Sequence, residues 1–232
     1  MADKTASRMN WRLKAGIQNT IAAFPIGSSA LYYGLQRALG GLRKGMNTPV
    51  ERFRSAIRIA DWIHAAGSTV ENKRFLEVGT GHMVNVPTAL WLIGAAETTT
   101  VDLYRYLSFT LIRESIQFIR DNESEVVALF GSRAGSATFQ SRLKQLLRFN
   151  GELNDLLAMM NVKYLSPADA SDLSASDRSF DFHISNTVLE HIPRAIILAI
   201  LREAKRVLAL DGMMVHIIDP SDHFSHSDSS IT

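Results

Sequence analysis

Short apolar, β-branched segments alternate with helical periods along most of the chain, and this alternation constrains the fold more than any other feature. The strand-like segments are residues 74–78, 98–102, 162–165, 180–184 and 213–218, and the clearest helical periods cover residues 87–93, 107–120 and 193–208. Strands that alternate with helices form parallel sheets, because each helix carries the chain back across the sheet and covers a face. The sequence therefore predicts an α/β fold with a doubly wound, mainly parallel sheet.

Two further helical regions add to this pattern. Residues 1–46 are typical of two short helices, and we expect residues 1–69 to form an N-terminal helical cap or lid on a domain that covers residues 70–232. Glycines punctuate helical periods between residues 121 and 161. Connections in such folds are usually only a few residues longer than their helix, so this segment is expected to be a helical insertion.

Composition limits the classes of function. The 232 residues contain no cysteine, which excludes a disulfide scaffold, a thiolate zinc site and a cysteine nucleophile. The formal net charge of +2 gives no general affinity for polyanions. The first 50 residues are nevertheless basic, and we expect this segment to act as a substrate lid or to contact a membrane surface. No secretory signal is recognisable, so the protein is expected to be cytoplasmic.

The stretch RFLEVGTGHM, residues 74–83, predicts a buried strand that runs into a glycine-rich turn. Such a turn exposes backbone N–H groups beside a helix N-terminus, where anions or ribose-bearing ligands bind. The third glycine of a dinucleotide fingerprint is missing, because Val84 stands there, and the lysine of a P-loop is missing too. Asp102 follows Gly79 by 23 residues. An acid there can accept hydrogen bonds from both hydroxyls of a ribose, or it can cap the following helix.

Several motifs, in the right order, resemble those of the class I S-adenosylmethionine-dependent methyltransferases. Glu77, Gly79 and Gly81 are similar to the acid and the glycines of the first family motif, with Met83 in place of the third glycine. Asp102 is similar to the ribose-binding acid of the family, and residues 168–170 (ADA) are similar to its adenine-binding segment. Residues 179–192 (SFDFHISNTVLEHI) resemble the fourth strand and its turn, and residues 202–219 resemble the helix and turn before the fifth strand.

The resemblance implies a Rossmann-like sheet with strand order 3-2-1-4-5 and S-adenosyl-L-methionine as cofactor. The family's sheet ends with a sixth and a seventh strand, and we expect both to be absent because few residues follow the fifth strand. The implied cofactor-binding residues are Glu77, Gly79, Thr80, Gly81, Asp102, Leu103, Asp169, Ala170 and Asn186. The implied substrate crevice contains Glu190 and His191.

We therefore expect a methyltransferase that acts on an oxygen of a small molecule, a glycan or a lipid-linked intermediate. His223 and His226 beside Asp222 are the candidate catalytic bases, since a histidine near a carboxylate accepts a hydroxyl proton near neutral pH. They could instead lie in a solvated terminal loop, and no metal is expected.

Nucleic acid is disfavoured as the acceptor, because residues 185–188 read SNTV where the amino-methylating enzymes of this fold carry D/N-P-P-Y. The alternative function is a non-catalytic methyltransferase-like module that binds a partner or a membrane surface through its N-terminal helices. Oligomer formation also stays open as an expectation.

Overall fold

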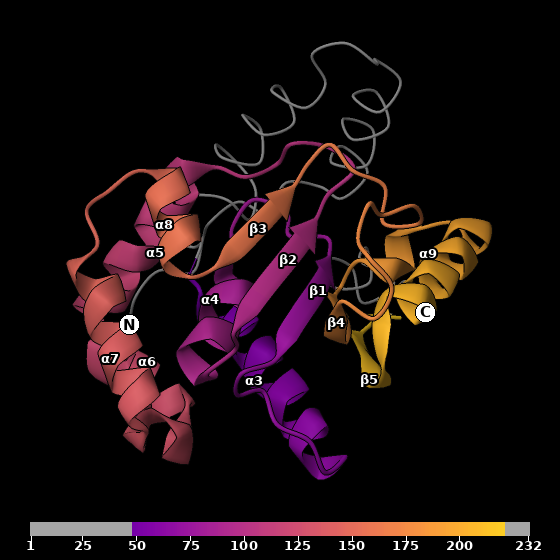
Figure 1. The fold of residues 1–232 in the computed structure, drawn as a ribbon. Coiled ribbons are helices and arrows are strands. Elements are labelled where there is room, and N and C mark those ends of the chain that lie inside the picture. The colour runs from indigo at the N-terminus through magenta and orange to yellow at the C-terminus, as the bar shows by residue number, and fades with distance from the viewer. Residues whose placement is uncertain (1–47, 221–232) are drawn as a thin grey trace, which may run out of the picture. The chain divides into compact units, whose positions relative to one another are not determined.

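The computed structural model describes residues 48–220, which contain a five-stranded, all-parallel sheet (Figure 1). Its strands are β1 (Arg74–Val78), β2 (Glu97–Val101), β3 (Val162–Leu165), β4 (Phe180–Asn186) and β5 (Leu208–Ile217). The helices are α3 (Val50–Ala65), α4 (Asn85–Ile93), α5 (Phe109–Asp121), α6 (Glu123–Leu129), α7 (Ala137–Arg148), α8 (Leu153–Met159) and α9 (Arg194–Val207), with 3-10 turns η1 (Gly131–Gly135) and η2 (Leu189–His191). The strand order is β3-β2-β1-β4-β5, which confirms the predicted fold class.

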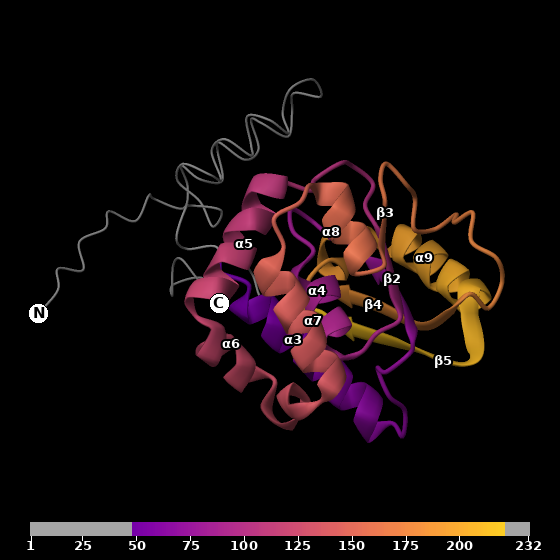
Figure 2. The same ribbon diagram turned by 60° about the vertical axis from the view of Figure 1, so that its left-hand side comes forward.

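Helices cover both faces of the sheet, and Figure 2 shows α4 and α9 on opposite sides of the strands. A large hydrophobic cluster on one face joins α3, α4 and the helices between β2 and β3 to Phe182 and Ile184 of β4. A smaller cluster on the other face contains Leu76 of β1 and Val207, the last residue of α9. Successive side chains of a strand point to opposite faces, so the neighbouring residues Phe75 and Leu76 of β1 belong to different clusters.

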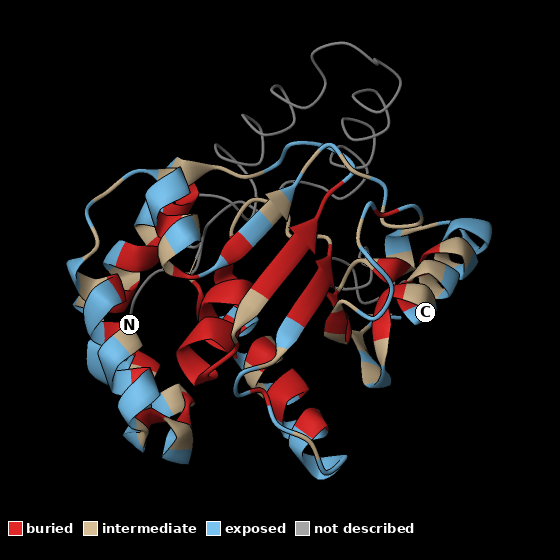
Figure 3. Cartoon of the chain, viewed as in Figure 1, coloured by how far each residue is buried: buried red, intermediate tan, exposed pale blue. Residues whose placement is uncertain are grey.

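The segment predicted as a helical insertion forms α6, η1, α7 and α8, and it packs directly on α4. Every residue of α4 is buried, which Figure 3 shows as an almost continuous red helix. Phe139 and Leu143 of α7 belong to the same hydrophobic cluster as α4. The Arg142 guanidinium donates hydrogen bonds to the carbonyl oxygens of Trp91 and Ala95, at the C-terminal end of α4. The insertion therefore covers a helix that has no polar face of its own.

The helix α3 packs on the sheet, although it falls within residues 1–69, which the sequence predicts as an N-terminal cap. Phe53, Ile59 and Ile63 are fully buried in the main hydrophobic cluster. Thr48–Asp219 forms a compact unit by itself, so the unit that contains the sheet begins before α3 and not at residue 70. The reason is that the apolar stripe of α3 finds its partners on α4 and the sheet. The helices predicted within residues 1–46 lie outside the described residues.

The fifth strand begins earlier than the predicted residue 213. Leu208 directly follows α9 and pairs with Phe180, and the register then shifts so that Met213 pairs with Phe182. The intervening residues form a bulged stretch of β5, in which a Cβ at Gly212 would lie 3.0 Å from the carbonyl oxygen of Asp181. A glycine is therefore used here for close approach to the backbone of β4, within the strand and not in a turn before it.

Candidate cofactor site

Gly79 and Gly81 form the turn between β1 and α4, at the carboxyl end of the sheet. Their φ angles are +85° and +69°, in the region that residues with a Cβ rarely adopt. A Cβ at Gly79 would lie 2.8 Å from Cγ1 of Val188, whereas one at Gly81 would meet no atom of the described residues within 4 Å. The first glycine therefore lets the turn pack against the segment after β4, and the second leaves open space where a ligand can approach the backbone.

Glu77 is the buried carboxylate beneath this turn. In the sheet register it lies opposite Thr100 of β2, whose hydroxyl donates a 2.7 Å hydrogen bond to Oε2 of Glu77. The Thr80 hydroxyl is hydrogen-bonded to the same Thr100 hydroxyl, so the turn and both strands are linked. Desolvation by burial raises the pKa of Glu77 to about 8, against the lowering effect of the Thr100 hydrogen bond. A cation bound beside Glu77 would therefore strongly favour the ionised carboxylate.

Asp102 directly follows β2 at the same edge of the sheet. Its Oδ2 accepts hydrogen bonds from the N–H of Gly81 at 3.1 Å and from the Tyr164 hydroxyl at 3.2 Å. Desolvation outweighs these hydrogen bonds and raises the pKa of Asp102 to about 6. The next residue, Leu103, is 58% exposed. The carboxylate thus holds the glycine turn and lies beside the open space at Gly81, with an apolar side chain next to it.

The loop after β3 lies against Asp102 and carries two more of the predicted residues. The Ala168 N–H donates a 3.0 Å hydrogen bond to the carbonyl oxygen of Asp102. Asp169 is exposed, and its Oδ1 accepts hydrogen bonds from the N–H and the hydroxyl of Ser171 at 2.8 and 2.7 Å. The structure therefore brings Asp169 and Ala170 near the predicted ribose-binding acid, with the Asp169 carboxylate bonded to its own loop.

Asn186 and Glu190 carry buried polar atoms at the carboxyl end of β4. Neither Oδ1 nor Nδ2 of Asn186 has a hydrogen-bond partner among residues 48–220, although the residue is only 5% exposed. Oε2 of Glu190 is also buried there without a partner, while Oε1 accepts from the Asp219 N–H at 3.4 Å. Buried polar atoms are nearly always hydrogen-bonded, so these atoms are suited to hydrogen bonds with a ligand or water. His191 lies beside Glu190 on η2 and is exposed.

The candidate catalytic residues Asp222, His223 and His226 lie outside the described residues. In the described part of the chain, no group of three or more His, Asp or Glu side chains could hold a metal ion. No helix of that part is long and apolar enough to cross a membrane.

Three groups that complete the site were not found from the sequence: Arg52, Thr100 and Tyr164. Arg52 lies in the first turn of α3, and its Nη1 donates a 2.9 Å hydrogen bond to Oγ1 of Thr187. Thr100 could have been found, because pairing the two predicted strands in register places it opposite Glu77. The contacts of Arg52 and Tyr164 depend on how distant elements pack, and no local pattern signals them.

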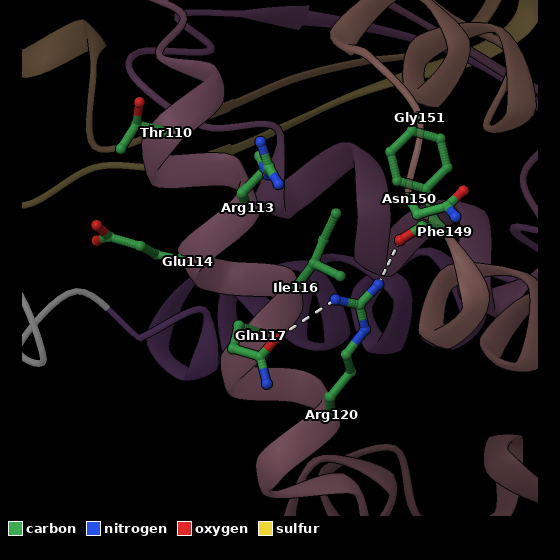
Figure 4. Close-up of a pocket in the computed structure, with 9 residues that line it drawn as sticks. All are labelled: Thr110, Arg113, Glu114, Ile116, Gln117, Arg120, Phe149, Asn150 and Gly151. Atoms are coloured by element: carbon green, nitrogen blue, oxygen red, sulfur yellow. Dashed lines mark hydrogen bonds between the residues drawn. The ribbon is translucent and has the colours of Figure 1, made fainter.

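A separate pocket of about 410 Å³ lies between α5 and the turn that joins α7 to α8 (Figure 4). The residues that line it are Thr110, Arg113, Glu114, Ile116, Gln117, Arg120, Phe149, Asn150 and Gly151. The Arg120 guanidinium donates to the carbonyl oxygens of Leu147 and Phe149 and to the Gln117 side chain. Its hydrogen bonds therefore serve to hold the turn after α7, and none of the predicted site residues lines this pocket.

Part of the chain matches a known protein family. Residues 135–216 match the family model of the methyltransferase domain. Comparison with curated protein sequences gives no match. Among solved structures, the chain is similar to phosphoethanolamine N-methyltransferase 1 of Haemonchus contortus, at 16% identity and a TM-score of 0.42, over 74% of this chain and 27% of that one.

Two further solved structures are similar to the same extent. One is the PH0226 protein from Pyrococcus horikoshii, at 17% identity and a TM-score of 0.46, over 86% of this chain and 67% of that one. The other is magnesium protoporphyrin IX methyltransferase from Synechocystis, at 13% identity and a TM-score of 0.43, over 78% and 62%. At TM-scores below 0.5, these similarities do not bear on the activity of this chain.

The family match runs from the end of η1 to β5, and it includes β3, β4 and α9. Glu77 on β1 and Asp102 directly after β2 precede the matched residues, and β1 and β2 belong to the same sheet as the matched strands. Residues 135–216 thus match the methyltransferase-domain family, and the strand order and the glycine turn between these two acids agree with the fold that the resemblance predicts.

Proposed function

We propose that this protein transfers a methyl group from S-adenosylmethionine to an oxygen of a small molecule, a glycan or a lipid-linked intermediate in the cytoplasm. The observation that carries the proposal is the pair of buried acids, Glu77 and Asp102, on either side of a turn with open space at Gly81. The unpartnered atoms of Asn186 support it, because they lie at the same edge of the sheet and lack hydrogen bonds that a ligand would supply.

Glu77, Asp102 and the residues beside Asp102 would each hold a different part of the cofactor. Glu77 would bind the ammonium group, since a buried carboxylate with a raised pKa gains most from an adjacent cation. Asp102 would accept hydrogen bonds from the ribose hydroxyls, with Leu103 and the Asp169–Ala170 loop around the adenine. When bound, the cofactor supplies a methyl group on a positively charged sulfur, which is open to direct displacement.

The acceptor must be held in line with the methyl group at contact distance. At the end of β4, Asn186 and Glu190 offer an amide and a carboxylate oxygen without partners in the described part of the chain. These atoms suit a hydroxyl acceptor, because a carboxylate accepts the hydroxyl hydrogen and orients the oxygen. The absence of cysteine excludes methylation through a cysteine adduct.

His223 or His226, beside Asp222, remains our candidate for the base that takes the hydroxyl proton. Asp219 contacts Glu190 through its N–H. If a histidine is the base, replacing both by Ala will lower kcat and leave the affinity for S-adenosylmethionine unchanged. A double variant with normal kcat would refute this assignment.

Calorimetric titration of S-adenosylmethionine tests the cofactor site. Asp102→Ala removes hydrogen bonds to a charged acceptor, which contribute about 1.5–3 kcal/mol, so the affinity should fall by at least about tenfold. Asp121→Ala, at an exposed position at the end of α5, is the control and should bind as the parent does. No binding by the folded parent protein would refute the proposed cofactor site.

Transfer of a labelled methyl group to a panel of phenols, sugars, polyprenyl-linked sugars and amines tests the acceptor. Label in an alkali-stable ether would support O-methylation, and label recovered only on nitrogen acceptors would contradict it. Cofactor binding without transfer to any member of the panel would instead favour the non-catalytic module.

A further inference from the structure

The pocket of about 410 Å³ between α5 and the turn at residues 149–151 has the size of a small-molecule site, since such sites occupy about 300–1,000 Å³ (Figure 4). Arg113, Ile116 and Arg120 line it from α5, and they share one face of the helix because they are three and four residues apart. Phe149 and Asn150 line it from the turn. The pocket is therefore built by two elements that carry no residue of the candidate cofactor site.

Arg113 contributes a guanidinium group whose hydrogen-bond donors are unused. Among residues 48–220 it forms no hydrogen bond and no ion pair, and its guanidinium carbon lies 5.7 Å from the centroid of the Phe109 ring. Contact with a neutral ring does not occupy the five N–H donors, which form a planar fork that matches the two oxygens of a carboxylate. The pocket therefore offers a cation whose donors have no acceptor in the described part of the chain.

Arg120 adds a second positive charge to the lining of the pocket. Its guanidinium group donates to the carbonyl oxygens of Leu147 and Phe149 and to Oε1 of Gln117, and all three acceptors are neutral. Among the described residues, Glu114 supplies the one carboxylate that lines the pocket, against two guanidinium groups. The lining thus carries a net positive charge, which favours an anionic ligand over a neutral one of the same shape.

The pocket also has apolar surface beside the arginines. Ile116 is buried in the main hydrophobic cluster, and the half-buried ring of Phe149 packs against the same cluster. Figure 4 shows the Phe149 ring across the pocket from the side chains of Arg113 and Ile116. A flat ring can pack against the ring of Phe149, while an anionic group attached to it reaches Arg113. The lining is therefore suited to an aromatic ring that carries a carboxylate.

We propose that this pocket binds an aromatic carboxylate, with the carboxylate on the Arg113 guanidinium and the ring on Phe149 and Ile116. The pocket is then a second binding site, apart from the cofactor site, and the inference does not depend on the proposed function. Phe149 belongs to the turn that Arg120 ties to α5. A ligand bound between this turn and α5 would add a further link between them and would stabilise the folded protein by mass action.

Naphthoate and its uncharged amide are matched probes, because they share the ring and differ in charge. Both are titrated into the isotope-labelled full chain and followed by NMR, in the parent protein, Arg113→Met, Arg113→Lys and Arg58→Met. We expect the parent to bind naphthoate at least about tenfold more tightly than the amide, which corresponds to about 1.4 kcal/mol. Arg113→Met should bring this ratio near one, and Arg113→Lys should restore part of it. Arg58→Met, at an exposed position on α3, is the control and should keep the ratio.

The same titration locates the probe, because the chemical shifts of Asn150 and Gly151 should change and those of Gly79 and Gly81 should not. Changes confined to the glycine turn would overturn the proposal. A parent protein that binds neither probe, or both equally, would overturn it too, as would an Arg113→Met variant that keeps the parent's preference. Asp102→Ala should bind naphthoate as the parent does, so this test and the titration of S-adenosylmethionine can fail separately.

Discussion

The buried carboxylate of Glu77 should destabilise the ligand-free protein, and Glu77→Gln should reveal by how much. Glutamine has nearly the same shape as glutamate, and its carbonyl oxygen can still accept the hydrogen bond from Thr100. The substitution therefore removes the titrating proton and leaves the packing around β1 intact. Glu77 is only 3% exposed, so solvent screens its charge little.

The size of the effect follows from the two pKa values. The folded protein keeps a proton on Glu77 up to about pH 8, whereas the unfolded chain releases it near its ordinary value of 4.5. Between these values the folded state binds more protons, so the stability contributed by this group falls as pH rises. At about 1.36 kcal/mol per pH unit, Glu77→Gln should gain stability over the parent by roughly 1, 3 and 4 kcal/mol at pH 5, 6.5 and 8.

Urea denaturation of both proteins at the three pH values measures this difference in the free energy of unfolding. Glu125→Gln, at an exposed position on α6, serves as the control for removing a surface carboxylate. Glu77→Gln should also bind S-adenosylmethionine more weakly, although it is the more stable protein. A stability difference that stays constant from pH 5 to pH 8 would refute the reasoning.

Three further results are expected. Gly79→Ala and Gly81→Ala both place a Cβ at positive φ, which destabilises the protein by about 1–2 kcal/mol. Only the Cβ at position 79 also meets a neighbouring side chain, so Gly79→Ala should lose more stability than Gly81→Ala, and equal losses in thermal unfolding would contradict this. Because an ammonium ligand favours ionised Glu77, affinity for S-adenosylmethionine should rise by up to tenfold per pH unit between pH 6 and 8, and a flat calorimetric profile would argue against that contact. Asp181→Asn should lose about 0.5–1 kcal/mol through its ion pair with Arg74, and an unchanged urea midpoint at low salt would show that the pair adds nothing.

Much of the fold could be predicted from local patterns. The bounds expected for β1 and β3 agree with the structure, because each is a short segment with apolar residues that is bounded by turn residues. β4 extends two residues beyond the prediction, to Asn186, since that residue pairs with Ile217 of β5. The early start of β5 could not be seen, because Asp211-Gly212 is a common turn signal and only the pairing with β4 shows that it lies in a bulge.

The candidate site likewise contains some residues that local patterns predict and others that they do not. Glu77, Gly79 and Asp102 were predicted because each stands at a fixed offset from a strand end, and the structure brings them to one edge of the sheet. Arg52 is separated from Thr187 by 135 residues, and only the packing of α3 on the sheet brings them together. Local periodicity contains no information on such long-range contacts.

The burial of α4 makes this helix depend on the segment that covers it. The helix that follows the glycine turn has no solvent-facing side, and its cover is the segment between β2 and β3. Arg142 of α7 holds the C-terminal end of α4 through the carbonyl oxygens of Trp91 and Ala95, at the end of the helix away from the glycine turn. Amino-acid replacements in this segment would act on the helix that follows the glycine turn, and deletion of the segment would expose the apolar side chains of α4 to water.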